Sequence, residues 1–181
     1  MNIIVKTASG HYVVRPDTSL ERKSSDLYLP DNAGPLSFSP VIYAHICKPG
    51  RSIGFRFAGR YYNSVSYGLL LYPRGLMDGT PEGYASAICQ NHMSFLNYPL
   101  EGFPAPGAYF KLFKDSEEIY RCIYDGRTEI EKAIAEATAG IYIRTGDLIA
   151  VELKENEFLC EGPAHIKATL DDSVLMDFRI I

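Results

Sequence analysis

The sequence lacks the features that mark membrane proteins and basic nucleic-acid-binding proteins. No hydrophobic run approaches the roughly 18 residues that a membrane-spanning helix requires. The N-terminus has neither the basic segment nor the long apolar core of a secretion signal. The 18 basic and 22 acidic residues give a net charge of −4, whereas nucleic-acid-binding domains carry excess positive charge. We therefore expect a cytoplasmic protein that binds neither a membrane nor nucleic acid.

Cysteine is scarce and tryptophan is absent. The four cysteines, Cys47, Cys89, Cys122 and Cys160, lie far apart and form no C-x-x-C pair. Structural zinc sites and disulfide frameworks have recognisable cysteine spacings, so we expect four reduced thiols here. The aromatic residues are 13 tyrosines and 9 phenylalanines, which together with 15 glycines and 11 prolines favour strands joined by turns.

What is present is the pattern of one β-rich domain. A chain of 181 residues has the usual size of a single domain. Residues 2–6 and 11–15 are β-rich and flank a turn, which predicts a hairpin. We expect residues 1–40 to form this hairpin and a proline-rich loop segment. The main domain then covers residues 41–181, and the two parts pack as one compact unit.

One segment has the periodicity of a helix. Ile130 and Ile134 recur at helical spacing, and Thr128 with Glu131 forms a capping box. We expect this helix to span about residues 128–139. Strands are expected over residues 41–46, 52–57, 65–72, 84–89, 108–114, 118–124, 164–170 and 174–180. The predicted fold class is therefore α+β, predominantly β, with one main helix.

The order of segments within residues 108–160 resembles the C-terminal half of the fumarylacetoacetate hydrolase (FAH) family. A hairpin is followed by the amphipathic helix and then by Thr145-Gly146-Asp147-Leu148-Ile149, where the family has P-G-D-x-I. Residues 158–163 resemble a later L-x-x-G-D motif, with Pro163 in place of the aspartate. By this resemblance the chain is a divergent FAH-like member. The resemblance implies a mixed β-roll or sandwich over residues 41–181.

Three upstream segments resemble the family's active-site segments. Lys48-Pro49 is similar to its K-P motif, residues 65–71 to its E-x-E-L strand, and residues 89–94 to its N-D-V-S segment. The resemblance implies magnesium or manganese held by three carboxylates, two of them on the E-x-E strand. Residues two apart on a strand share a face, so two such carboxylates converge on one ion. The metal then holds a 2-oxo or β-diketo acid and stabilises the enolate formed in the reaction.

The ligand positions implied by this resemblance hold Ser66, Gly68 and His92 in this chain. Glycine has no ligand atom in its side chain, serine is neutral, and histidine suits zinc, nickel or copper better than magnesium. We therefore expect that the metal site is lost and that no cofactor is bound. Magnesium or manganese would be the cofactor if the chain were an active enzyme.

Lys48, at the K-P position, is the one candidate catalytic residue, although a lone lysine makes no mechanism. Arg51 and Arg60 belong to a cluster of cationic and aromatic side chains suited to binding an organic acid. Tyr67 and His92 complete the candidate binding residues. The alternative interpretation of the cluster is that surface arginines lie over tyrosine rings.

Three functions remain open at this point. The first is a divergent FAH-like protein that has lost its metal site and binds a small organic acid. The second is an active metal-dependent hydrolase, decarboxylase or isomerase acting on 2-oxo or β-diketo acids. The third is a β-rich protein-interaction module. The sequence leaves open whether the chain is an enzyme, and the family resemblance implies a homodimer.

Overall fold

The computed structural model describes residues 1–23, 25–97 and 102–181. Two sheets and three α-helices make up the fold, with short 3-10 helices at Asp17–Ser19 and Arg74–Leu76. The strands are β1 (Asn2–Lys6), β2 (Tyr12–Pro16), β3 (Leu20–Glu21), β4 (Leu36–Ile46), β5 (Tyr62–Pro73), β6 (Ser94–Phe95), β7 (Tyr109–Lys114), β8 (Glu117–Ile123), β9 (Leu148–Glu152), β10 (Glu157–Cys160), β11 (Ala164–Leu170) and β12 (Ser173–Ile180). The helices are α1 (Phe55–Ala58), α2 (Pro81–Ile88) and α3 (Thr128–Thr138).

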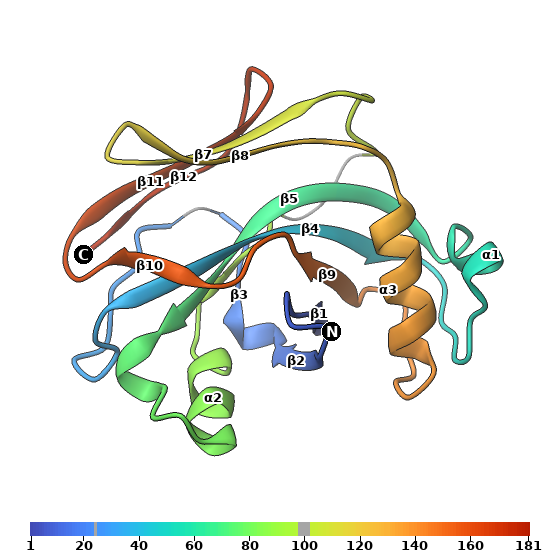
Figure 1. Cartoon of the computed structure of the whole chain (residues 1–181), viewed down its shortest axis with the longest axis horizontal. Helices are drawn as coiled ribbons and strands as arrows, with labels where there is room; N and C mark the ends of the chain where they lie inside the picture. The colour runs from blue at the N-terminus through green and yellow to red at the C-terminus, as the bar shows by residue number, and fades with distance from the viewer. Residues whose placement is uncertain (24, 98–101) are drawn as a thin grey trace.

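The larger sheet is curled around a core of its own. Its strand order is β2-β1-β9-β4-β5-β6-β3, and β10 pairs with β4 outside this path. Figure 1 shows the long strands β4 and β5 in the middle of the molecule, with β1, β2 and β3 folded beneath them. The second sheet, of order β12-β11-β7-β8, lies above them in the same view. The chain is therefore layered, and β4 and β5 are its central strands.

Apolar side chains fill both sides of these central strands. Alternate residues of β5 contribute to two separate hydrophobic clusters, because successive strand residues point to opposite faces. One cluster joins the two sheets. In it the rings of Phe95 and Phe178 are stacked with centroids 3.7 Å apart. The other lies inside the curl of the larger sheet and includes Val41, Tyr43 and Leu70.

Several predictions from the sequence are confirmed. The structure is an α+β fold dominated by strands, and α3 is the longest described helix. The N-terminal hairpin is formed by β1 and β2, and the last hairpin by β11 and β12. Beyond these predictions, the structure shows that residues 1–40 share the larger sheet with later residues, because β1 pairs in parallel with β9 and β4 begins at Leu36. No helix of the described residues is both long and apolar enough to cross a membrane.

Two predicted strands are wrong. Residues 84–89 fall mostly in α2, whose first turn is stabilised by Thr80: its side chain accepts the N–H of Gly83, and Pro81 occupies the first helical position. Residues 52–57 form a loop and the start of α1, because Ser52 adopts a positive φ of 53° that no strand permits. In both segments, residues that favour a turn or a helix start outweigh the β-forming side chains. Residues 98–101, between β6 and β7, lie outside the described part of the chain.

Candidate functional site

The end of the β4–β5 pair that leads into α1 carries Ser66, one of the residues singled out by the family resemblance. In the antiparallel register, Tyr43 lies opposite Ser66 and His45 lies opposite Ser64. Directly opposed residues of paired strands present their side chains on the same face. Tyr43 is fully buried, and Ser64 and Ser66 are 2% and 7% exposed. A row of hydroxyl groups therefore lies inside the curl at this end of the larger sheet.

The Tyr43 hydroxyl links this row to the segment after β6. It donates a hydrogen bond to the backbone oxygen of Asn97 at 2.7 Å, and it is also hydrogen-bonded to Ser66. Burial raises the pKa of Tyr43 well above its usual value, because the charged phenolate would be poorly solvated there. Tyr43 is therefore a neutral hydrogen-bond donor. Sequence reasoning missed Tyr43, Ser64 and Asn97, although the period of two along β5 was a signal for Ser64.

Gly68 lies on the same face of β5 as Ser64 and Ser66, but this position has no room for a side chain. A Cβ atom added to Gly68 would lie 2.5 Å from Leu96 Cδ2 and 2.7 Å from the Phe95 carbonyl oxygen. Two pairs of positions on this face are two residues apart: Ser64 with Ser66, and Ser66 with Gly68. Neither pair contains a carboxylate. Within the described ranges, no group of three histidine, cysteine, aspartate or glutamate side chains could hold a metal. These donors do not fit magnesium or manganese, which prefer anionic oxygen ligands.

The structure does not bring His92 to this group. The pairing of Leu70 with Ser94 places His92 toward the other end of β5, roughly 20 Å from Ser66 at the usual rise along a strand. His92 has a positive φ of 60°, and its Nδ1 lies 2.9 Å from Oε2 of Glu21. It is therefore part of a separate polar pair.

Tyr67 belongs to the core rather than to a ligand site. Its side chain lies on the opposite face of β5 from Ser66, and its ring stacks on that of Phe110 with centroids 4.8 Å apart. Only 2% of the residue is exposed. A direct contact between Tyr67 and a bound acid is therefore not supported by the geometry.

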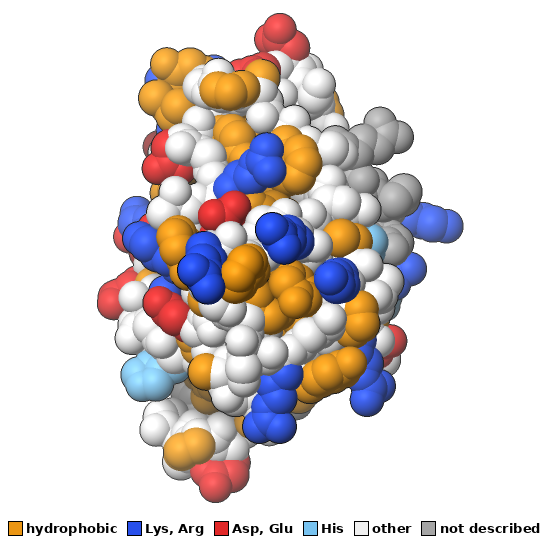
Figure 2. Space-filling model, turned by 90° about the vertical axis from the view of Figure 1, so that its right-hand side faces the viewer, with side chains coloured by type: hydrophobic (Ala, Val, Ile, Leu, Met, Phe, Trp, Pro, Cys, Tyr) orange, Lys and Arg blue, Asp and Glu red, His pale blue; other side chains and the backbone are white. Residues whose placement is uncertain are grey.

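Lys48, Arg51 and Arg60 lie on the connection from β4 through α1 to β5, at the same end as Ser64. Lys48 Nζ is 5.3 Å from the centre of the Tyr61 ring, and the Arg60 guanidinium is 5.3 Å from that of Phe57. We call the following residues the basic rim: Lys48, Arg51, Arg56, Arg60 and Arg127. Figure 2 shows basic side chains lying among hydrophobic ones over the end of the molecule that carries α1 and α3.

The charge of this end is set by an unusual stretch of sequence. Residues 32–77 contain five lysines and arginines and no aspartate or glutamate, although the whole chain is acidic. Glu131 of α3 is a counter-charge at this end, and its Oε1 accepts a hydrogen bond from the Tyr62 hydroxyl at 3.1 Å. Exposed cations over aromatic rings attract anions while keeping their charged groups in water. The end of the β4–β5 pair thus combines neutral hydroxyls with a positively charged surround.

Comparison with known proteins gives a match in structure alone. No protein-family model matches the chain, and no curated protein does. A protein from Yersinia pestis described as belonging to the FAH family superimposes with a TM-score of 0.83 at 15% identity, covering 99% of this chain and 92% of the other. Fumarylpyruvate hydrolase from Pseudomonas aeruginosa, in complex with Mn²⁺ and pyruvate, gives a TM-score of 0.82 at 15% identity. That match covers 100% of this chain and 89% of the hydrolase.

A third structure extends the same group to an isomerase. The 5-carboxymethyl-2-hydroxymuconate delta-isomerase from Mycobacterium smegmatis has a TM-score of 0.79 at 14% identity, with 99% of this chain and 78% of that chain covered. Hydrolases and isomerases therefore share this architecture, and the architecture does not choose between them. The chain has the fold of the fumarylacetoacetate hydrolase family, as the order of its C-terminal segments predicted.

Proposed function

We propose that this FAH-fold protein binds a small organic acid at the end of the β4–β5 pair without a divalent metal, and that it has lost the metal-dependent reaction. One observation carries the proposal. The face of β5 presents Ser66 and Gly68 where the family resemblance places carboxylate ligands, and Ser64 lies beside them on the same face. Neutral hydroxyls cannot replace the anionic oxygens that a hard dication requires.

The same change favours direct contact with an anion. In the arrangement implied by the resemblance, protein carboxylates hold a cation and the cation holds the acid. Here Tyr43 donates its hydroxyl hydrogen to Asn97 and Ser64 donates to Asn63, so Ser66 is the hydroxyl of this row that can turn its hydrogen toward a ligand carboxylate, which is an acceptor. Lysine and arginine of the basic rim raise the local concentration of anions and form charge-assisted hydrogen bonds with them. The charge of the ligand is then balanced by the protein rather than by a metal.

The class of acid follows from the fold neighbours. The fumarylpyruvate hydrolase structure contains pyruvate, a 2-oxo acid, together with Mn²⁺. We therefore propose 2-oxo acids and their enolate-like analogues as ligands. Pyruvate and oxalate are the probes, because oxalate has the planar, two-oxygen geometry of an enolate.

Calorimetric titration of the whole protein tests this proposal. We expect pyruvate or oxalate to bind equally well in EDTA and in magnesium or manganese. Arg60→Gln combined with Arg51→Gln should weaken binding by roughly tenfold, as expected when charge-assisted contacts are removed. Arg74→Gln is the matched control, because Arg74 belongs to the same acid-free stretch but follows the far end of β5. Binding that requires manganese and is accompanied by turnover would instead support an active enzyme.

A protein-interaction module is the second candidate, and one observation favours it. Phe55 and Phe57 on α1 are 48% and 38% exposed. Large apolar side chains exposed together on a surface are typical of protein-interaction sites. The resemblance also implies a homodimer, which we retain as a proposal. Light scattering at micromolar concentration is expected to give twice the mass of the chain in wild type. A monomer would contradict the homodimer, and loss of the dimer in Phe55→Ser would locate the contact on α1.

A further inference from the structure

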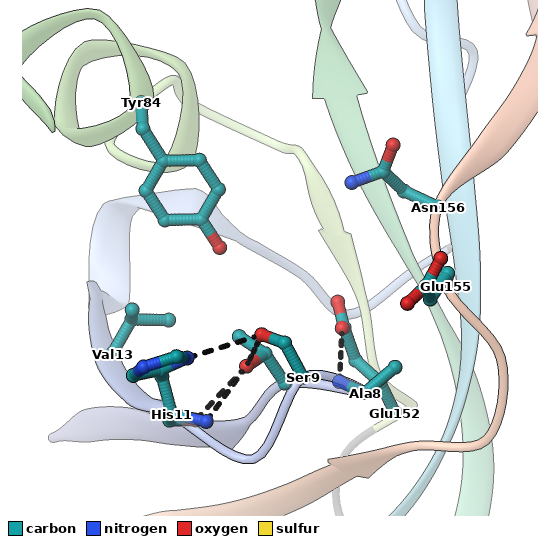
Figure 3. A pocket seen from close by; sticks show the side chains of 9 residues that line it. Ala8, Ser9, His11, Val13, Tyr84, Glu152, Glu155 and Asn156 are labelled. Carbon is teal, nitrogen blue, oxygen red and sulfur yellow. Dashed lines mark hydrogen bonds between the residues drawn. The ribbon is translucent and has the colours of Figure 1, made fainter. Parts of the chain in front are cut away.

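The opposite end of the same sheet contains a pocket of about 350 Å³. It lies between the turn joining β1 and β2, helix α2, and the loop after β9. Its lining consists of Thr7, Ala8, Ser9, His11, Val13, Tyr84, Glu152, Glu155 and Asn156. Figure 3 shows the Tyr84 hydroxyl extending toward the space between α2 and Glu152, with Glu155 and Asn156 on the far side. Glu152 lies opposite Val41, which in turn lies opposite Gly68, whereas the other lining residues lie outside the β4, β5 and β9 strands.

Glu152, the last residue of β9, is fixed in this pocket by two donors. Its Oε2 accepts the backbone N–H of Ala8 at 2.9 Å, and its Oε1 accepts the hydroxyl of Tyr72. The Tyr72 ring is stacked with that of Tyr84, with centroids 6.2 Å apart. Burial and the charge of Glu152 raise the pKa of Tyr84, so both tyrosines are neutral. The Glu152 carboxylate is therefore held in one orientation beside the stacked rings of Tyr72 and Tyr84.

No lysine or arginine is among the described residues that line the pocket; its basic side chain is His11, whose Nδ1 lies 3.2 Å from Ser9 Oγ, and its acidic side chains are two carboxylates. Arg15 lies 4.4 Å from the Tyr72 ring centre but is fully buried, and it donates to the Leu71 and Met93 carbonyl oxygens. Lys154, in the adjacent loop, is paired with Glu157 at 2.7 Å. The pocket consequently has a negative charge, an aromatic surface and several neutral hydrogen-bond acceptors.

We infer that this pocket binds a small organic cation, a protonated amine or a guanidinium compound with a short apolar body. Glu152 and Glu155 supply the opposite charge, and the Asn156 side-chain oxygen accepts an N–H. The Tyr84 ring faces the cation or its methylene groups, and Val13 extends the apolar surface. A bare metal ion fits less well, because the described residues of the pocket offer no triad of metal ligands. The inference does not depend on the proposed binding of an acid at the other end.

Titration monitored by amide NMR tests the inference on the intact chain. n-Butylammonium is the probe, n-butanol is its neutral isostere, and sodium chloride controls for ionic strength. The backbone amide of Ala8 is the reporter, because it donates to Glu152. We expect a saturable shift of the Ala8 resonance with n-butylammonium and none with n-butanol or salt. Glu155→Gln should weaken the affinity roughly fivefold, and Tyr84→Leu by about three- to tenfold.

Two further outcomes decide the case. Glu117→Gln removes the same charge at the exposed turn between β7 and β8, and it should leave the affinity unchanged. If the alcohol shifts Ala8 as strongly as the ammonium does, or if Glu155→Gln and Glu117→Gln behave alike, the inference is overturned. The absence of any saturable shift in wild type would overturn it as well. Glu155 is exposed, so its substitution breaks no contact in the core. The Glu155→Gln variant should therefore fold, and a change in its affinity reports on binding.

Discussion

The two ends of the β4–β5 pair differ in how they hold charge. At the pocket end, Arg15, Tyr72 and Glu152 form a chain of contacts in which each charged group is fixed by hydrogen bonds or by a ring. At the rim end, the cations lie exposed over aromatic rings, and the interior holds hydroxyl groups and the buried Asp147, whose carboxylate accepts the backbone N–H groups of Asn2 and Arg144. The comparison teaches that one pair of strands can present opposite charge at its two ends. It does so because charge near the interior requires fixed partners, whereas charge at the surface is solvated by water.

The largest expected effect is at the pocket end. Arg15→Met should lower the free energy of unfolding by about 3 kcal/mol, because the carbonyl oxygens of Leu71 and Met93 lose a buried donor. Urea unfolding measures the change, with the exposed Lys23→Met as the matched control. If Arg15→Met lowers the free energy of unfolding no more than the control does, the buried arginine does not stabilise this end.

A second substitution tests the packing of β5 between the rim end and the pocket end. Gly68→Ala should cost about 2 kcal/mol, since the added carbon would meet Leu96 and the Phe95 carbonyl at less than 3 Å. Gly162→Ala is the control, because a Cβ there meets nothing within 4 Å. If the two variants unfold at the same urea concentration, the interior at Gly68 has more room than the structure indicates. A side chain could then be accommodated there.

The link between the charged residues of the pocket end is expected to contribute less. Tyr72→Phe removes the hydroxyl that donates to Glu152 and should cost about 1 kcal/mol. The exposed Tyr28→Phe provides the reference measurement. Tyr72→Phe should also move the Ala8 amide resonance, because Glu152 loses one of its two anchors. An unchanged Ala8 resonance would mean that Glu152 is held by the backbone N–H alone.

The smallest effect is expected on the surface between the two ends. Hydrogen bonds from Lys6 and Tyr12 lower the pKa of Glu136 below its ordinary value of 4.5. A lowered folded-state pKa contributes stability above the unfolded pKa, and this contribution is lost as the pH falls through the folded value. Because Glu136 is largely exposed, the contribution is below about 0.5 kcal/mol. Wild type should therefore lose slightly more stability than Glu136→Gln between neutral pH and about pH 3, and an equal loss would contradict the shift.

Local patterns in the sequence were informative where the structure depends on near neighbours. The helix α3 and the terminal hairpin were predicted because their periodicity is visible within about a dozen residues. The helix α2 was missed although Thr80 and Pro81 carry an N-terminal helix signal. There the helix start at residues 80–81 decides the conformation of residues 84–89.

The candidate site was predictable only in part. The absence of carboxylates at Ser66 and Gly68 could be read directly, and Ser64 was within reach of the same argument. The separation of His92 from Ser66 could not be read, because it follows from the pairing of Leu70 with Ser94 between strands distant in the chain. The burial of Tyr67 against Phe110 likewise depends on how the second sheet lies over the first.

By itself, the sequence determined the β-rich class, the main helix, the acid-free stretch of residues 32–77 and the segment order that resembles the FAH family. These properties depend on composition and on short-range periodicity. Only the tertiary structure decided which residues share a face, that Tyr43 closes the hydroxyl row, and that His11, Tyr84 and Glu152 surround one pocket. Strand register and sheet curl bring together residues far apart in sequence, and no local pattern encodes that choice.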